Sequence, residues 1–276
     1  MCLSMFVFSA VDAQAKFLTG IFDPFQVVWM RQMGLFVGVM LLLFLRGTAI
    51  LKTQKVGLQL SRGACAALSA SLFIIGVSYV PLADAVAVTF IAPLLVTIMA
   101  ALFLGEYVGI HRWTAVLIGF VGTLIIIRPG FDSFHPALFL PLIAAFLFAG
   151  RQIISRFLSG IDSTETTIAY TAIASTVILS LPLPFVWQNP QSQNEFFLIF
   201  CLASMAALGE LLVIKALEIA LAVVVSPMQY TIIIWASFYG FMVFDHLPDI
   251  YTLGGTAIII LSGLYTLHRE RFPRGE

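Results

Sequence analysis

The chain has 276 residues, of which 61% are hydrophobic and only 10% are charged, and its mean hydropathy is +1.04. Soluble globular domains carry roughly 25% charged residues. This composition therefore has too few charged residues for a surface that faces water, which excludes a soluble globular protein. The 14 basic and 14 acidic residues balance, so the sequence lacks the excess of positive charge that nucleic-acid binding requires, and we expect no nucleic-acid partner.

Apolar runs long enough to cross a bilayer follow one another along the whole chain. We predict about ten transmembrane helices, at residues 1–19, 24–45, 62–80, 83–104, 112–128, 136–157, 165–187, 196–215, 222–244 and 250–267. The longest polar connections are residues 46–62 and 182–195. Neither connection has room for a soluble domain. The predicted fold class is therefore an all-α integral membrane protein.

The two halves of the chain match each other at an offset of about 140 residues. Residues 16–20 (KFLTG) align with residues 156–160 (RFLSG), and the Ala-Ala-Leu at 66–68 aligns with that at 206–208. Since each half holds an odd number of spans, the second half must enter the membrane from the opposite side. Such inverted repeats around a central cavity are typical of secondary transporters. We predict a first five-helix repeat at 1–130, a second at 136–268 and a cytoplasmic tail at 269–276.

The positions of Lys and Arg predict the orientation of the chain, because cytoplasmic loops are enriched in these residues. If the N-terminus is cytoplasmic, every Lys and Arg except Lys16, Arg31 and Arg128 lies on or toward the cytoplasmic side. An even number of spans returns the C-terminus to that side as well. We expect an integral protein of a bacterial inner (plasma) membrane with both termini in the cytoplasm.

Several short stretches together resemble the EamA type of the drug/metabolite transporter superfamily, and the resemblance covers essentially the whole chain. They are residues 25–31 (FQVVWMR), 81–85 (PLADA), 104–106 (LGE), 128–130 (RPG) and 229–249. The resemblance implies ten helices, both termini inside and a central cavity. It also implies a carrier, because the family contains exporters of amino acids and importers of riboflavin or S-adenosylmethionine. Glu210 departs from the family pattern, since many relatives carry His or another polar residue there.

Charged residues inside the predicted spans are the first candidates for function, because a charge at the bilayer centre costs at least about 2.5–3.5 kcal/mol. At 1.5 Å per residue, Asp12 and Arg31 reach the same depth on neighbouring helices, so we predict an ion pair between them. This pair either bridges the fold or takes part in substrate contact or gating. Arg151 and Glu210 reach a similar depth in the second half. They are interpreted either as a structural pair or as a site where Glu210 binds a proton or a cationic amine.

The remaining site candidates are aromatic rings and an amide that can line a wet cavity or, alternatively, belong to the interface belt or to packing. They are Trp29, Tyr79, Gln229, Tyr230 and Trp235. Two prolines inside predicted spans either hinge or merely kink their helices, because proline leaves a backbone carbonyl without its donor. These hinge candidates are Pro93 and Pro227.

The sequence contains no HExxH motif, no GxSxG elbow and no phosphate-binding GxxxxGK[ST] loop, so we expect neither an enzyme nor an ATP-driven pump, and no metal or cofactor. The predicted function is secondary transport of a small polar metabolite, an amino acid or a derivative, by alternating access. An ion gradient such as that of protons, exchange or the substrate gradient would drive it. The alternatives are uptake of a cofactor such as riboflavin or S-adenosylmethionine, and a membrane-embedded lipid enzyme.

Overall fold

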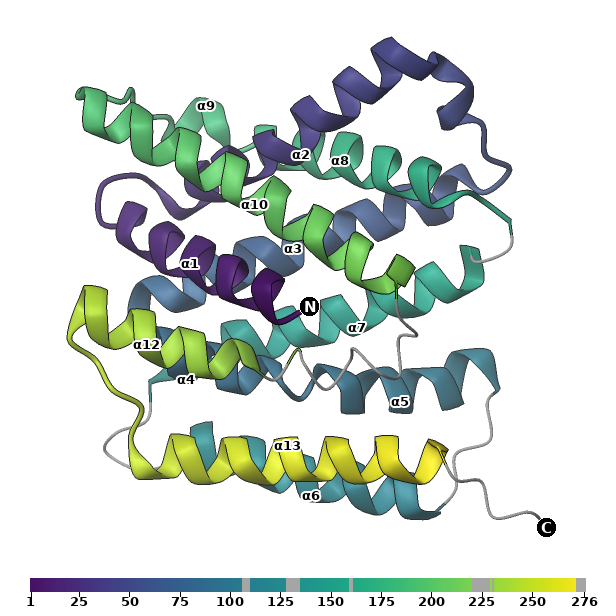
Figure 1. The fold of residues 1–276 in the computed structure, drawn as a ribbon, viewed down its shortest axis with the longest axis vertical. Helices are drawn as coiled ribbons and strands as arrows, with labels where there is room; N and C mark the ends of the chain where they lie inside the picture. Colours follow the sequence, from purple (N-terminus) through teal and green to yellow (C-terminus); the bar gives the residue numbers. More distant parts are fainter. Residues whose placement is uncertain (106–109, 128–134, 159–160, 220–228, 230, 272–276) are drawn as a thin grey trace.

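The computed structural model describes residues 1–105, 110–127, 135–158, 161–219, 229 and 231–271, and these residues form an all-α bundle (Figure 1). Each predicted span contains an α-helix. The α-helices are α1 Cys2–Leu18, α2 Pro24–Arg46, α3 Val56–Tyr79, α4 Leu82–Thr89, α5 Ala92–Leu104, α6 Ile110–Ile127, α7 Phe139–Leu158, α8 Thr164–Ser180, α9 Leu183–Val186, α10 Gln193–Ile219, α12 Ile232–Phe244 and α13 Ile250–Arg271. Two 3₁₀ turns, Thr48–Leu51 (η1) and Pro136–Leu138 (η2), precede α3 and α7.

Many of these helices have the length and apolarity of membrane spans. Five segments qualify fully, at Pro24–Arg46, Val56–Tyr79, Leu82–Leu104, Pro136–Leu158 and Gln193–Val213. Three shorter apolar helices lie at Trp113–Ile127, Ile232–Phe244 and Ile250–Tyr265. Large apolar side chains remain exposed along the bundle, which suits a surface that faces lipid rather than water.

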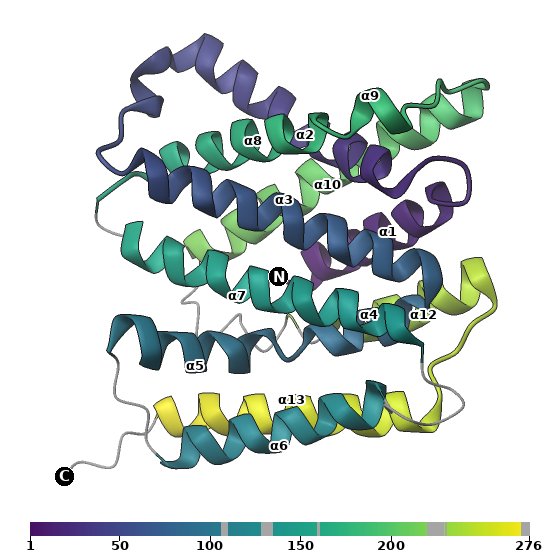
Figure 2. The ribbon, with the colours of Figure 1, turned by 180° about the vertical axis from the view of Figure 1, so that it is seen from behind.

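The helices pack in a regular arrangement that the two opposite views show well. In Figure 1, α1 lies in front between α10 and α12, and it packs against both. In Figure 2, α7 occupies the same place from behind, between α3 and α5. Helix α2 also packs against α8, and α4 against α12. Helices α6 and α13 pack along each other at one edge.

Glycines allow α6 and α13 to approach closely. A Cβ added at Gly122 would lie 2.8 Å from the carbonyl oxygen of Gly255, and a Cβ added at Gly255 would lie 2.6 Å from that of Gly122. In lipid, where association of helices cannot rely on the hydrophobic effect, such close contact of small residues supplies much of the attraction. The pair therefore fixes this edge of the bundle.

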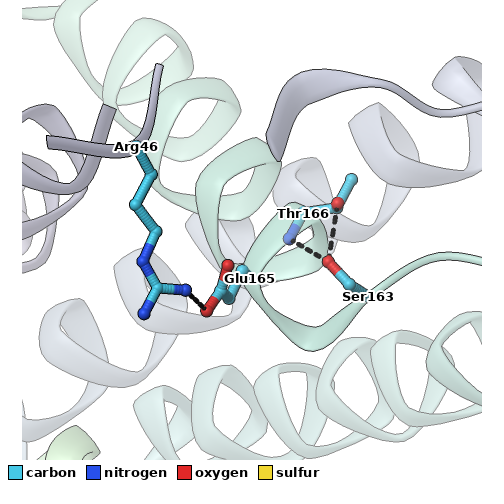
Figure 3. A network of polar contacts seen from close by, with 4 residues as sticks. All are labelled: Arg46, Ser163, Glu165 and Thr166. Carbon is cyan, nitrogen blue, oxygen red and sulfur yellow. Dashed lines mark hydrogen bonds and ion pairs between the residues drawn. The ribbon is translucent and has the colours of Figure 1, made fainter. Parts of the chain in front are cut away.

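The ends of several helices follow from their sequence. Asp23 caps α2 by accepting a hydrogen bond from the backbone N–H of Phe25 at 2.9 Å, and Gly47 ends the helix with φ +75°. Ser163 caps α8 by accepting a hydrogen bond from the backbone N–H of Thr166 at 3.1 Å (Figure 3). Short polar side chains at these positions satisfy N–H groups that have no partner within the helix.

The predicted span 83–104 is broken into two helices, α4 and α5, instead of being continuous. The N–H groups of Phe90 and Ile91 bond to carbonyls three residues earlier, those of Ala87 and Val88. Pro93 lies in the first turn of α5 and has no N–H to offer the carbonyl four residues before it. The interruption is therefore explained locally, while the proposed hinge motion stays a prediction. The other hinge candidate, Pro227, lies outside the described residues.

The structure corrects three predicted boundaries. Helix α3 begins at Val56 rather than at residue 62, so the polar connection after α2 is shorter than expected. The span 165–187 consists of α8 and the short α9, with a break near Pro182. Helix α13 continues to Arg271, which places the start of the predicted tail within a helix. The first correction matters most, because it places the buried side chain of Gln59 within a helix instead of a loop.

Candidate functional site

Asp12 on α1 and Arg31 on α2 form the predicted ion pair, with Arg31 Nη1 3.5 Å from Asp12 Oδ1. Asp12 is only 6% exposed, while Arg31 is half-buried. Asp12 Oδ1 accepts no hydrogen bond within the described part of the chain. The aspartate therefore depends on the nearby guanidinium for compensation of its buried charge.

A second charged cluster is built around Arg62 on α3, which the structure places inside the bundle. Its Nε donates a hydrogen bond to Ser155 Oγ on α7 at 2.7 Å. Its Nη1 donates to the backbone carbonyl of Thr167 at 3.4 Å and to the hydroxyl of Thr171, both on α8. These bonds fix the Arg62 side chain between three helices.

Arg151 on α7 belongs to the same cluster but has a different environment. Its guanidinium carbon lies 4.8 Å from the centre of the Phe148 ring, within the range of a cation–π contact. Its Nε is buried without a hydrogen-bond partner, and within the described part of the chain no group accepts a hydrogen bond from this guanidinium. Ser155, which accepts a hydrogen bond from Arg62, donates one to the backbone carbonyl of Arg151 at 2.8 Å, and the two guanidinium groups repel each other electrostatically.

Glu210 on α10 is within electrostatic range of both arginines. Its carboxylate attracts both Arg62 and Arg151 through space. The direct ion pair that the sequence suggested between Arg151 and Glu210 is not formed, since the described ion pairs are Asp12–Arg31 and Arg46–Glu165. Helix α10 packs against α1 and α2, whereas α3 and α7 pack along each other. The carboxylate thus acts on the arginines from a different part of the bundle.

Two of the aromatic candidates lie in packing contacts. Trp29 donates from Nε1 to Ser180 Oγ at 2.9 Å and meets the Trp187 ring edge-on at 5.7 Å. Tyr79, at the end of α3, is 64% exposed and stacks on His135, with ring centres 6.2 Å apart. Neither residue lies with Arg62, Arg151 and Glu210.

The remaining candidates come from the ninth predicted span. Trp235 on α12 packs edge-on against Phe6 of α1 at 5.0 Å, and its Nε1 is buried with no partner among the described residues. That unpartnered donor keeps Trp235 as a candidate for contact with a substrate. Gln229 is exposed, and Tyr230 lies outside the described residues.

Sequence reasoning missed Gln59, which it placed in the connection after α2, and Arg62, which it placed at the cytoplasmic end of the third predicted span. Gln59 is fully buried, and its Nε2 donates to Asp162 Oδ2 at 2.7 Å and to Thr167 Oγ1 at 3.2 Å. The apolar residues between Val56 and Arg62 were the available signal, since they continue the helical run toward the N-terminus. A polar residue in such a run can be a buried partner rather than the end of a helix.

The cavities of the described part of the bundle include the following two. The larger, of about 460 Å³, lies between the α1–α2 turn and the α9–α10 connection and is lined by Ile21, Phe22, Gln188, Asn189, Gln191 and Glu195. A smaller one of about 310 Å³ lies among α1, α10 and α12, and its lining includes Gln14 and Tyr239. Neither is lined by the charged clusters. No metal-binding group of three or more His, Cys, Asp or Glu occurs among the residues described.

Known proteins resemble this chain in sequence. The profile of the EamA-like transporter family matches residues 1–128. A riboflavin transporter of Vibrio cholerae is 34% identical over 216 residues, which cover 77% of this chain and 72% of that protein. The chain belongs to the EamA-like transporter family. It is therefore a membrane transporter and not an enzyme, as the resemblance of its motifs implied.

Other relatives of this EamA-like transporter match almost its whole length. An S-adenosylmethionine uptake transporter of Rickettsia felis is 28% identical, over 98% of this chain and 91% of that protein. A pseudopaline exporter of Pseudomonas aeruginosa is 25% identical, over 94% of this chain and 92% of that protein. A crystal structure with 15% sequence identity matches with a TM-score of 0.63, covering 99% of this chain and 98% of the other. That last match shows a shared fold over the full chain.

Proposed function

We propose that this EamA-like transporter is a secondary transporter that moves an amino acid or amino acid derivative across the bacterial inner (plasma) membrane. The observation that carries the proposal is the cluster of Arg62, Arg151 and Glu210, which brings charges of both signs into the bundle. Buried charges are costly, so a site that keeps them needs a partner or a purpose. A zwitterionic metabolite has an anionic group that complements the arginines and a cationic group that complements the glutamate.

Alternating access would follow from two inverted five-helix repeats, and the packing of the helices supports this arrangement. If the helices of the first half are matched in order to those of the second, α1 corresponds to α7, and α3 to α10. The packed pair α3–α7 then corresponds to the packed pair α10–α1, and α3–α8 to α10–α2. The family profile ends at residue 128, close to the end of the first proposed repeat. The two repeats would rock against each other around the charged cluster, with both termini on the cytoplasmic side.

S-adenosylmethionine is the first metabolite to test. It is an amino acid derivative with a carboxylate, an amino group and a sulfonium cation, and uptake transporters for it match this chain over 98% of its length. Riboflavin is the second candidate, because the relative with 34% identity transports it. The pseudopaline exporter transports in the outward direction, so both directions of transport need to be measured.

Uptake by the purified full-length protein in liposomes, with and without an imposed proton gradient, tests this proposal. The panel contains amino acids, S-adenosylmethionine and riboflavin. We expect transport of an amino acid or derivative and none of riboflavin. A protein that carries riboflavin alone would contradict the proposed substrate class and favour the second candidate.

Glu210→Gln tests the role of the cluster in the same assay. We expect a folded, membrane-inserted protein whose transport is lost or no longer responds to the pH gradient, because the variant cannot exchange a proton. Glu165→Gln is the matched control, since Glu165 is an exposed carboxylate that pairs with Arg46 outside the cluster. Wild-type rate and wild-type pH response in Glu210→Gln would mean that Glu210 only supports the fold.

A further inference from the structure

The cluster around Arg62 carries an imbalance of charge. It contains two guanidinium groups, those of Arg62 and Arg151, and one carboxylate, that of Glu210. Glu210 is the carboxylate that acts on Arg151 electrostatically. With all three groups ionised, the cluster has a net charge of about +1 in surroundings where an uncompensated charge is expensive.

The two arginines differ in how fully the protein satisfies them. Arg62 is held by Ser155, Thr167 and Thr171, so its position is set by the scaffold. Arg151 has a ring contact with Phe148 but donates no hydrogen bond to any described residue, and its Nε is buried. A buried donor without an acceptor costs about 1–3 kcal/mol, and more when it is charged. The guanidinium group of Arg151 is therefore the part of the cluster that lacks a hydrogen-bond acceptor.

The missing acceptor can be identified by its charge and shape. One monoanion neutralises a net charge of +1, and a planar carboxylate matches the two parallel donors of a guanidinium. Glu210 attracts both arginines but contacts neither as an ion pair. A carboxylate that bound Arg151 directly would replace Glu210 as the main counter-ion.

We propose that Arg151, positioned beside the anchored Arg62, is the receptor for a carboxylate of the transported metabolite, and that Glu210 is the counter-ion that this carboxylate replaces. The proposal rests on the proposed function, since it names the chemical group by which that site recognises its substrate. Arg62 acts as a positioning residue that adds positive charge. Glu210 compensates the charge of Arg151 while the site is empty. When substrate is bound, the substrate carboxylate takes the place of Glu210 as the counter-ion of Arg151.

Cys65 provides a reporter for this site that does not depend on transport. It lies on α3, is half-buried and interacts electrostatically with Arg151. In a Cys2→Ser/Cys201→Ser protein, Cys65 is the remaining cysteine and can be alkylated with the neutral reagent N-ethylmaleimide. The rate of alkylation is measured with paired probes that differ by one carboxylate: S-adenosylmethionine and its decarboxylated form, and L-methionine and 3-(methylthio)propylamine.

We expect the carboxylate member of a pair to protect Cys65 at a concentration about tenfold lower than its amine, at the low end of what hydrogen bonds to a charged group contribute. Arg151→Gln should abolish this difference. Arg151→Lys should reduce it, because lysine keeps the positive charge but lacks the two parallel N–H donors of the guanidinium group. Arg46→Gln is the matched control, since Arg46 is an exposed arginine that pairs with Glu165. It should leave the difference unchanged.

Glu210→Gln gives the sharpest test, because it removes the competing counter-ion. We expect this variant to be protected by carboxylates at a lower concentration than the protein with Glu210, although its transport fails. Three results would each overturn the proposal. The first is equal protection of Cys65 by the carboxylate and the amine of a pair, and the second is a difference between them that persists in Arg151→Gln. The third is weaker protection by carboxylates in Glu210→Gln than in the protein that keeps Glu210. If the protein transports amino acids or S-adenosylmethionine but their carboxylates do not protect Cys65, only the proposed role of Arg151 as carboxylate receptor is refuted. If carboxylates protect Cys65 but the protein transports none of the tested metabolites, only the proposed function is refuted.

Discussion

The ion pair between Asp12 and Arg31 makes a quantitative prediction about stability. Asp12→Asn and Arg31→Gln each leave the partner charge in the bundle, where the aspartate is 6% exposed and the two charged atoms are 3.5 Å apart. At that distance two unit charges attract by about 5 kcal/mol if the effective dielectric constant is about 20. We expect each single substitution to lower the free energy of unfolding by about 3–5 kcal/mol, the usual cost of breaking a buried pair.

The double variant Asp12→Asn/Arg31→Gln is expected to be less destabilised than the sum of the single variants by at least about 2 kcal/mol, because it leaves no unpaired charge. The assay is unfolding of the purified protein in mixed micelles with increasing denaturing detergent, followed by circular dichroism. The coupling energy of the mutant cycle is the quantity to be compared.

The pair between Arg46 and Glu165 is the control for this cycle (Figure 3). Its side chains are 59% and 43% exposed, so solvent screens their attraction. An exposed pair contributes about 0.2–1 kcal/mol, and we expect the Arg46→Gln/Glu165→Gln cycle to fall in that range. If the Asp12–Arg31 cycle gave a coupling no larger than the control, the two residues would not depend on each other, and the argument from burial would be refuted.

Two further predictions concern packing and orientation. Gly34→Ala on α2 should lower the free energy of unfolding by about 1–3 kcal/mol, because the new Cβ would lie 1.9 Å from the carbonyl oxygen of Ala203 on α10. Gly38→Ala on the same helix, where the Cβ meets nothing within 4 Å, should not, and equal losses in both variants would reject close α2–α10 packing as the cause. In a cysteine-free background, Gln191→Cys should react with an impermeant maleimide on intact cells and Lys52→Cys should not; the opposite pattern would reverse the proposed orientation.

The sequence was sufficient to predict which stretches contain helices, although not where each helix begins, ends or breaks. Helix positions follow from runs of apolar residues whose length matches a bilayer, and each predicted span contains a helix. The pairing of Asp12 with Arg31 was also predictable, because a fixed rise per residue gives the depth of each side chain on consecutive helices.

Depth did not determine which side chains meet. Arg151 and Glu210 reach a similar depth and were interpreted either as a structural pair or as a binding site, yet α10 packs against α1 and α2 while α7 packs against α3. Lateral distance depends on the order in which helices pack and on the rotation of each helix about its axis. Neither quantity is contained in a count of residues along one helix.

The same reason explains the other differences. Gln59 and Arg62 appeared to belong to the end of a polar connection, and only their partners Thr167 on α8 and Ser155 on α7 show that they lie within a helix packed in the bundle. Tyr79 was a cavity candidate by residue type, but tertiary structure gives it His135 as a neighbour at the end of α3. The sequence by itself determined the family, the spans and the charges that must be explained. Which of these charges find partners within the protein was decided by the packing of helices distant in sequence.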